Sequence, residues 1–143
     1  MLRKILAVVA AVVVASAVVF VVELGIPLIW PLPDELAGAV KECPLDMEKI
    51  RALADRFPPG AFFGVLAGWV LGAVSGAVVA TLIAARTSLV PGLVFGGIFL
   101  AVCLSNLFLL QIHPHWFWAA TLVLVPAGAY LGTRLVAGKR QAA

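Results

Sequence analysis

Four apolar stretches, each long enough to cross a lipid bilayer, dominate this chain. They cover residues 5–30, 61–85, 89–112 and 116–136. A bilayer core is about 30 Å thick, so a helix that rises about 1.5 Å per residue needs about 20 apolar residues to cross it. Backbone groups left unpaired in lipid are costly, which makes a helix the expected form of each stretch. We therefore predict an all-α fold in which residues 1–143 form a single transmembrane domain, a four-helix bundle.

The composition of the chain indicates that lipid is its main solvent. Hydrophobic residues make up 64% of the 143 residues and charged residues only 12%, whereas soluble domains carry roughly 25% charged residues. A chain this short cannot bury so much apolar surface in a core of its own. Its ten lysines and arginines are scattered over tails and loops, and nucleic-acid binding would require a basic stripe. We expect a lipid bilayer around the chain and no nucleic-acid partner.

The first apolar stretch also has features of a cleavable signal peptide. Arg3 and Lys4 precede the apolar run, and residues 15–17 read Ala-Ser-Ala, which resembles a cleavage site. The apolar run continues as far as Trp30, however, and this is longer than the core of a signal peptide. The length favours a retained span, with cleavage as the alternative.

Positive charge near the span ends predicts which side of the membrane each loop faces. The two tails and the turn at Arg86 together carry six basic residues and no acid, whereas residues 31–60 carry four basic and six acidic residues. Basic flanks are retained in the cytoplasm. We predict cytoplasmic N and C termini and a segment over residues 31–60 on the opposite, outer side of the membrane, which in a bacterial cell would be the periplasm. Trp30, Trp116 and Trp118 would then anchor the outer ends of their spans.

The outer segment over residues 31–60 is bounded by prolines and carries a helical pattern. Asp34 is positioned to begin one helix, which Pro44 interrupts. Over residues 46–57 apolar side chains recur at a spacing of three to four, which indicates an amphipathic helix. Such a helix would lie at the water–lipid boundary or cover the end of the bundle. We predict a short helical hairpin, and its role as a lid, a docking surface or a connector stays open.

Small residues recur every four positions in the second stretch. Gly64, Gly68, Gly72 and Gly76 lie on one helical face, where they allow two membrane helices to approach closely. This glycine stripe is predicted to pack on the chain's own helices, and the alternatives are a second copy of the protein or another membrane protein. The candidate partners on the other spans are Ala7, Ala11, Ala15, Gly97, Ala101, Ser105, Gly128 and Gly132.

A few polar side chains within the apolar stretches form the candidate site. Glu23 is the one acidic residue in any predicted span, about 10 Å inside the outer boundary at about 1.5 Å per residue. Trp69, Asn106 and Thr121 fall near the same depth on the other three spans, and His113 lies two turns beyond Asn106. Polar groups at this depth are costly, which makes them candidates for function.

Two interpretations of this polar cluster differ in their chemistry. In the first, Glu23 is a proton acceptor or a cation ligand in a small cavity that opens outward and is gated by the outer segment. In the second, Glu23, Trp69 and Asn106 form a buried hydrogen-bond network that fixes the helix register. A zinc site on Glu23, His113 and His115 would lack the usual ligand spacing. No metal, no cofactor and no catalytic residue is therefore assigned.

Several short motifs are shared with a known group of proteins. The chain carries His-Pro-His-Trp-Phe-Trp at residues 113–118 and Val-Glu-Leu-Gly at residues 22–25. With its proline-flanked outer segment and the proline of its last span, it resembles an uncharacterised family of small four-span proteins of bacterial inner membranes. The resemblance implies that location and points to Glu23, Asn106 and His113. It implies no particular activity.

These observations support three hypotheses of function. The first is a non-enzymatic accessory or assembly protein that acts through helix–helix contacts in the membrane, because of the glycine stripe and the scarcity of reactive groups. The second is a small oligomeric transporter or channel in which Glu23 titrates. A membrane enzyme comes third, because only Glu23 and His113 would support it. The sequence leans away from an enzyme.

Overall fold

The computed structural model describes residues 2–41, 47–84 and 88–137. Over these ranges it is helical, with no strand, as the all-α prediction requires. Four of the helices are long and apolar enough to cross a membrane, and they lie over the four predicted stretches. Their bounds are Leu2–Ile29 for α1, Pro59–Ala84 for α4, Val90–Leu110 for α5 and His115–Ala137 for α6.

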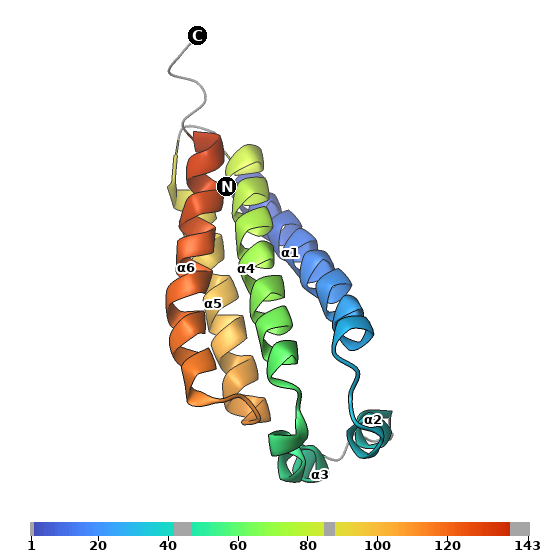
Figure 1. Ribbon diagram of the computed structural model, residues 1–143. Coiled ribbons are helices and arrows are strands. Elements are labelled where there is room, and N and C mark those ends of the chain that lie inside the picture. Colours follow the sequence, from blue (N-terminus) through green and yellow to red (C-terminus); the bar gives the residue numbers. More distant parts are fainter. Residues whose placement is uncertain (1, 42–46, 85–87, 138–143) are drawn as a thin grey trace.

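The helix α4 lies at the centre of the bundle. The helices α1, α5 and α6 all pack against it, and α5 and α6 also pack against each other. Figure 1 shows α1 inclined across one side of α4, with α5 and α6 on the other side. At the N-terminal end of α1, the Nε of Arg3 donates to the carbonyl oxygen of Ile83 near the end of α4, at 2.6 Å. Contacts between α1 and α5 are sparse, so the bundle is open between these two helices.

The glycine stripe of α4 lies against α1. A Cβ added at Gly76 would stand 3.0 Å from the carbonyl oxygen of Ala11, and one at Gly72 would stand 3.3 Å from that of Ala15. Both alanines are fully buried. Glycine and alanine thus let the two backbones approach within the distance that a larger side chain would occupy.

On another side, α4 is approached by α6. A Cβ added at Gly128 would stand 3.2 Å from the carbonyl oxygen of Val70, and one at Gly132 would overlap the backbone of Val74. The contact at Gly132 is the tighter of the two, and all three of its nearest atoms are backbone atoms, which cannot rotate aside. This is the closest kind of helix packing that a small residue allows.

The prediction for the third span was wrong. Gly97, Ala101 and Ser105 were expected to pack inside the bundle, but all three are exposed, and no atom lies within 4 Å of a Cβ added at Gly97. The inward face of α5 instead carries Phe95 and Phe99, which stack at 5.6 Å between ring centroids. Two phenylalanines bury far more apolar surface than a row of small residues does.

The helices of the outer segment are shorter than predicted. It contains α2 (Asp34–Lys41), α3 (Met47–Ala52) and the 3-10 turn η1 (Ala54–Arg56), at the end of the bundle opposite the N terminus (Figure 1). The single helix predicted over residues 46–57 is therefore divided. The interruption predicted at Pro44 lies outside the described residues.

Arginines attach the outer segment to its surroundings. Arg51 of α3 donates through Nε and Nη2 to the carbonyl oxygens of Leu110 and Leu109, at 3.1 and 2.5 Å. These are among the last carbonyls of α5, which have no partner within their own helix and carry partial negative charge. Arg56 of η1 pairs with Glu35 of α2 at 2.7 Å. Arg51 thus holds the segment against the end of α5, and the Arg56–Glu35 pair holds η1 to α2 within the segment.

Candidate functional site

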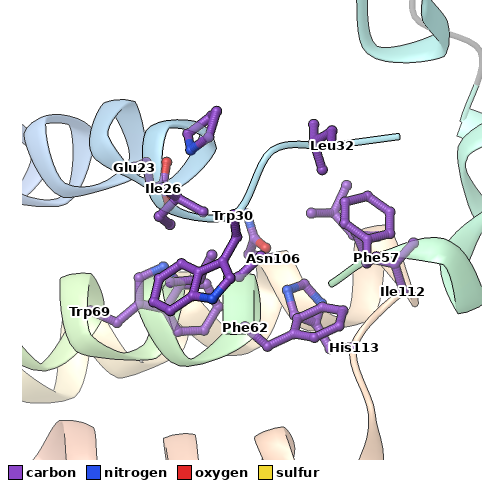
Figure 2. Close-up of a pocket in the computed structure, with 14 residues that line it drawn as sticks. Glu23, Ile26, Trp30, Leu32, Phe57, Phe62, Trp69, Asn106, Ile112 and His113 are labelled. Carbon is purple, nitrogen blue, oxygen red and sulfur yellow. The ribbon is translucent and has the colours of Figure 1, made fainter. Parts of the chain in front are cut away.

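A cavity of about 310 Å³ lies near the outer end of the bundle, between α1, α4, α5 and the outer segment. Figure 2 shows Glu23 at one end of the cavity and Phe57 and Ile112 at the other, with Trp30 and Asn106 between them. Most of the wall is apolar. Its polar and aromatic residues are Glu23, Trp30, Phe57, Phe62, Trp69, Asn106 and His113.

Three helices bring their polar residues to this cavity. Glu23 on α1 and Asn106 on α5 have exposed side chains, while Trp69 on α4 is buried. The indole of Trp69, which can only donate, makes a side-chain hydrogen bond to Glu23. Pro27, four residues after Glu23, has no N–H, so the carbonyl of Glu23 lacks its helical partner. The side chain of Pro27 also lines the cavity, next to Glu23.

A second cavity, of about 320 Å³, adjoins the first. Both are lined by Glu23, Trp69 and Asn106. The second continues toward the middle of the bundle along the opening between α1 and α5, where Phe20 and Val102 are exposed. We call this opening the α1–α5 groove. It gives the carboxylate of Glu23 access to the side of the bundle as well as to its outer end.

His113 reaches the cavity by a route that the sequence did not reveal. We expected it on one face of α5 with Asn106, but α5 ends at Leu110, and Gln111 adopts a left-handed conformation with φ of 53°. The chain turns there and directs His113 inward. Its ring centroid lies 4.7 Å from that of Phe117 and 5.6 Å from that of Phe62.

The environment of His113 favours its neutral form. Burial among aromatic rings lowers the pKa of the imidazole, because a charged ring would lose its hydration there. Its Nδ1 is buried and has no hydrogen-bond partner. The side chain therefore presents an aromatic ring, with an unused nitrogen, to the wall of the cavity.

Trp30 belongs to the cavity, and sequence reasoning missed this. It was expected as an anchor at the membrane boundary, but its indole lies over Gly60 and lines the cavity. A Cβ added at Gly64 would also meet its ring, at 3.3 Å. The signal in the sequence was Gly60 itself, which extends the glycine stripe by one turn toward the outer end.

Thr121 was expected at the same level, but it takes no part in the cavity. Its side chain is fully buried, its hydroxyl has no partner, and it does not line either cavity described above. The polar residues that line the cavity therefore come from α1, α4, α5 and the turn at His113, and α6 contributes none of them. Among the described residues, no three histidine, cysteine, aspartate or glutamate side chains could hold a metal ion together.

The arrangement offers acceptor chemistry in an apolar setting. A carboxylate and an amide oxygen stand beside aromatic rings, and no lysine or arginine occurs among the described residues that line the cavity. Among the described residues that line the two cavities, no serine or cysteine lies next to a histidine, as a nucleophile and its base would require. No protein-family model, curated protein or solved structure matches the chain. The functional conclusion therefore follows from the chemistry of the cavity.

Proposed function

We propose that this chain is a transporter of the bacterial inner membrane that binds a small amphipathic molecule in the outer half of the bilayer. In this proposal the four long helices span the membrane, both termini are cytoplasmic, and the segment from α2 to η1 faces the periplasm. Glu23 is the group that binds the substrate and a proton in turn, so that movement of the substrate is coupled to movement of protons. The observation that carries the proposal is the cavity shared by Glu23, Trp69, Asn106 and His113.

The pairing of the polar groups supports a binding site over a structural network. A network that fixes helix register would have its members paired, because unsatisfied polar groups in lipid are costly. Glu23 has Trp69 as a partner, but within the described residues the amide of Asn106 has none. Both side chains are exposed in the α1–α5 groove. Ionisable residues at this depth usually mark the path of a substrate or ion.

An assembly protein is the second candidate. The exposed row of Gly97, Ala101 and Ser105 on α5 favours it, because such a row allows a helix of another protein to approach closely. The glycine stripe of α4 is already occupied by α1. If assembly is the function, replacing Ala101 by Leu should abolish association with a second membrane protein and leave any transport intact.

Proton movement in reconstituted liposomes tests the transport proposal. Liposomes that contain the protein and a trapped pH-sensitive dye would be exposed to gradients of small amphipathic amines, carboxylic acids and neutral amides. At least one class should drive a change in internal pH that Glu23→Gln abolishes. The matched control is Glu35→Gln, since Glu35 is an exposed acid of the outer segment. If no class produces a pH change above that of empty liposomes, the proposal is wrong.

A further inference from the structure

We infer that the ligand of the cavity is an amphipathic organic cation, whose ammonium group pairs with Glu23 while its apolar part lies among the aromatic rings. The inference rests on the proposed function, because it names the class of molecule that the same cavity would take. It follows from the charge of the cavity, from its walls and from its connection to the groove.

The charge of the cavity selects a positive ligand. Glu23 is the one ionisable acid among the described residues that line it, and no lysine or arginine lines it. The two arginines of the adjoining outer segment are both engaged: Arg51 with carbonyls at the end of α5, and Arg56 with Glu35. The negative charge of Glu23 thus has no cationic partner within the cavity. An ammonium group would supply one in a setting of low dielectric, where pairing is strong.

The walls of the cavity add to this preference. Trp30, Phe57, Phe62 and Trp69 all line it, and the faces of aromatic rings attract cations. The same faces repel anions, and burial lowers the pKa of His113, which favours its neutral form. The indole N–H of Trp69 is already used by Glu23. An anionic ligand would therefore meet a carboxylate and negative ring faces with no charged donor to bind it.

The size and connections of the cavity fit a small ligand with an apolar part. About 310 Å³ is at the low end of the range of roughly 300–1,000 Å³ for small-molecule sites. The cavity continues into the α1–α5 groove, whose exposed rim includes Phe20 and Val102. An amphipathic molecule could reach Glu23 from the hydrocarbon through this groove. An ammonium group of this kind could come from a lipid headgroup or from a free amine.

Intrinsic fluorescence of the cavity tryptophans provides the test. In nanodiscs that contain only phosphatidylglycerol, the protein with Trp116 and Trp118 replaced by Phe keeps Trp30 and Trp69 as reporters. Titration with tetrapropylammonium should change their emission saturably. A neutral dialkyl amide of similar carbon number and an alkyl carboxylate should have no effect. Glu23→Gln should weaken tetrapropylammonium binding about tenfold or more, since it removes a charged partner.

Three further variants make this result decisive. Glu23→Asp keeps the charge and should retain most of the affinity, which controls for misfolding of Glu23→Gln. Asn106→Leu should weaken binding by a smaller factor, and Glu35→Gln should leave it unchanged. Equal binding of the cation to Glu23→Gln and to the unsubstituted protein would overturn the inference, as would equal binding of the neutral amide.

Lipid composition distinguishes the two sources of the ammonium group. If phosphatidylethanolamine is the source, adding it to the nanodiscs should compete with tetrapropylammonium in a manner that depends on Glu23. A lack of competition would assign the site to free amines, and either result requires the cation site.

Failure of the transport proposal would give a different result: cations would bind, but no solute would drive proton movement. If acids or neutral amides drove it instead, transport would stand and the cation inference would fall.

Discussion

At the scale of single residues, His113 shows how burial sets a pH dependence. Its ring lies among Phe62, Phe117 and Trp69, with the centroid of Trp69 at 6.2 Å. Burial lowers the pKa of the folded-state imidazole, while in the unfolded chain the pKa is roughly 6.5. Below that value the unfolded state binds more protons than the folded state does. Acid therefore shifts the equilibrium toward unfolding.

The stability of the protein should accordingly fall as the pH drops below roughly 6.5. We expect the free energy of unfolding, measured by SDS titration in mixed micelles, to be lower at pH 5.5 than at pH 7.5. His113→Gln should remove most of this difference, because glutamine does not titrate. His115→Gln is the matched control, since the side chain of His115 is exposed, and it should leave the difference in place. An unchanged pH dependence in His113→Gln would contradict this explanation.

Gln111 is a second residue whose substitution should change the free energy of unfolding. It is the one described non-glycine residue with positive φ, at 53°, and it ends α5 by donating its N–H to the carbonyl of Leu107 at 3.1 Å. A side chain in the left-handed region costs about 1–2 kcal/mol, which glycine avoids. Gln111→Gly should therefore raise the free energy of unfolding by about 1 kcal/mol, and Gln111→Val should lower it. A loss of stability in the glycine variant would mean that the side chain has an undetected role.

At the scale of helices, the close contact between α4 and α6 should make a measurable contribution to stability. A Cβ at Gly132 would overlap the backbone of Val74, whereas one at Gly97 meets nothing within 4 Å. Gly132→Ala should lower the free energy of unfolding by about 1–3 kcal/mol, the usual cost of overpacking. Gly97→Ala is the matched control and should be neutral or slightly stabilising, since alanine favours a helix over glycine. The same SDS titration measures both, and equal effects would contradict the packing of α6 on α4.

Helix lengths could be predicted from the sequence, but helix rotations could not. The four long helices follow from apolar length alone, and the similar positions of Glu23, Trp69 and Asn106 along their helices follow from the rise per residue. The rotation of α5 about its own axis could not be predicted, because this helix is apolar on nearly all sides and gives no periodic signal of its buried face. Its exposed side was decided by packing, which buried Phe95 and left Ala101 outside.

The candidate site could be predicted from the sequence only in part. Glu23 and Asn106 could be identified because polar residues in an apolar span stand out. Trp30 and Phe57 could not, because aromatic residues near a boundary fit an anchoring role equally well. The place of His113 depends on the left-handed turn at Gln111, and glutamine is not a residue type that predicts such a turn. Tertiary contacts therefore completed a site of which the sequence revealed only the polar members.

At the scale of the whole molecule, the proposed sidedness puts the mouth of the cavity in the periplasm. The outer segment precedes the N-terminal end of α4, whereas Ser88 lies between the C-terminal end of α4 and the start of α5. In a variant with Cys43 replaced by Ser, Asp34→Cys should react with a membrane-impermeant maleimide in intact cells. Ser88→Cys should react only after lysis. Labelling of Ser88→Cys alone in intact cells would reverse the proposed topology.

The central claim is that the Glu23 carboxyl group lies in an apolar cavity where an organic cation can reach it. Dicyclohexylcarbodiimide, an apolar reagent that adds to carboxyl groups within membranes, tests this claim most directly. Peptide mass spectrometry should find the adduct on Glu23 and not on Glu35. Tetrapropylammonium should suppress the adduct, and the neutral amide should not. Absence of modification at Glu23, or equal protection by the amide and the cation, would contradict the account.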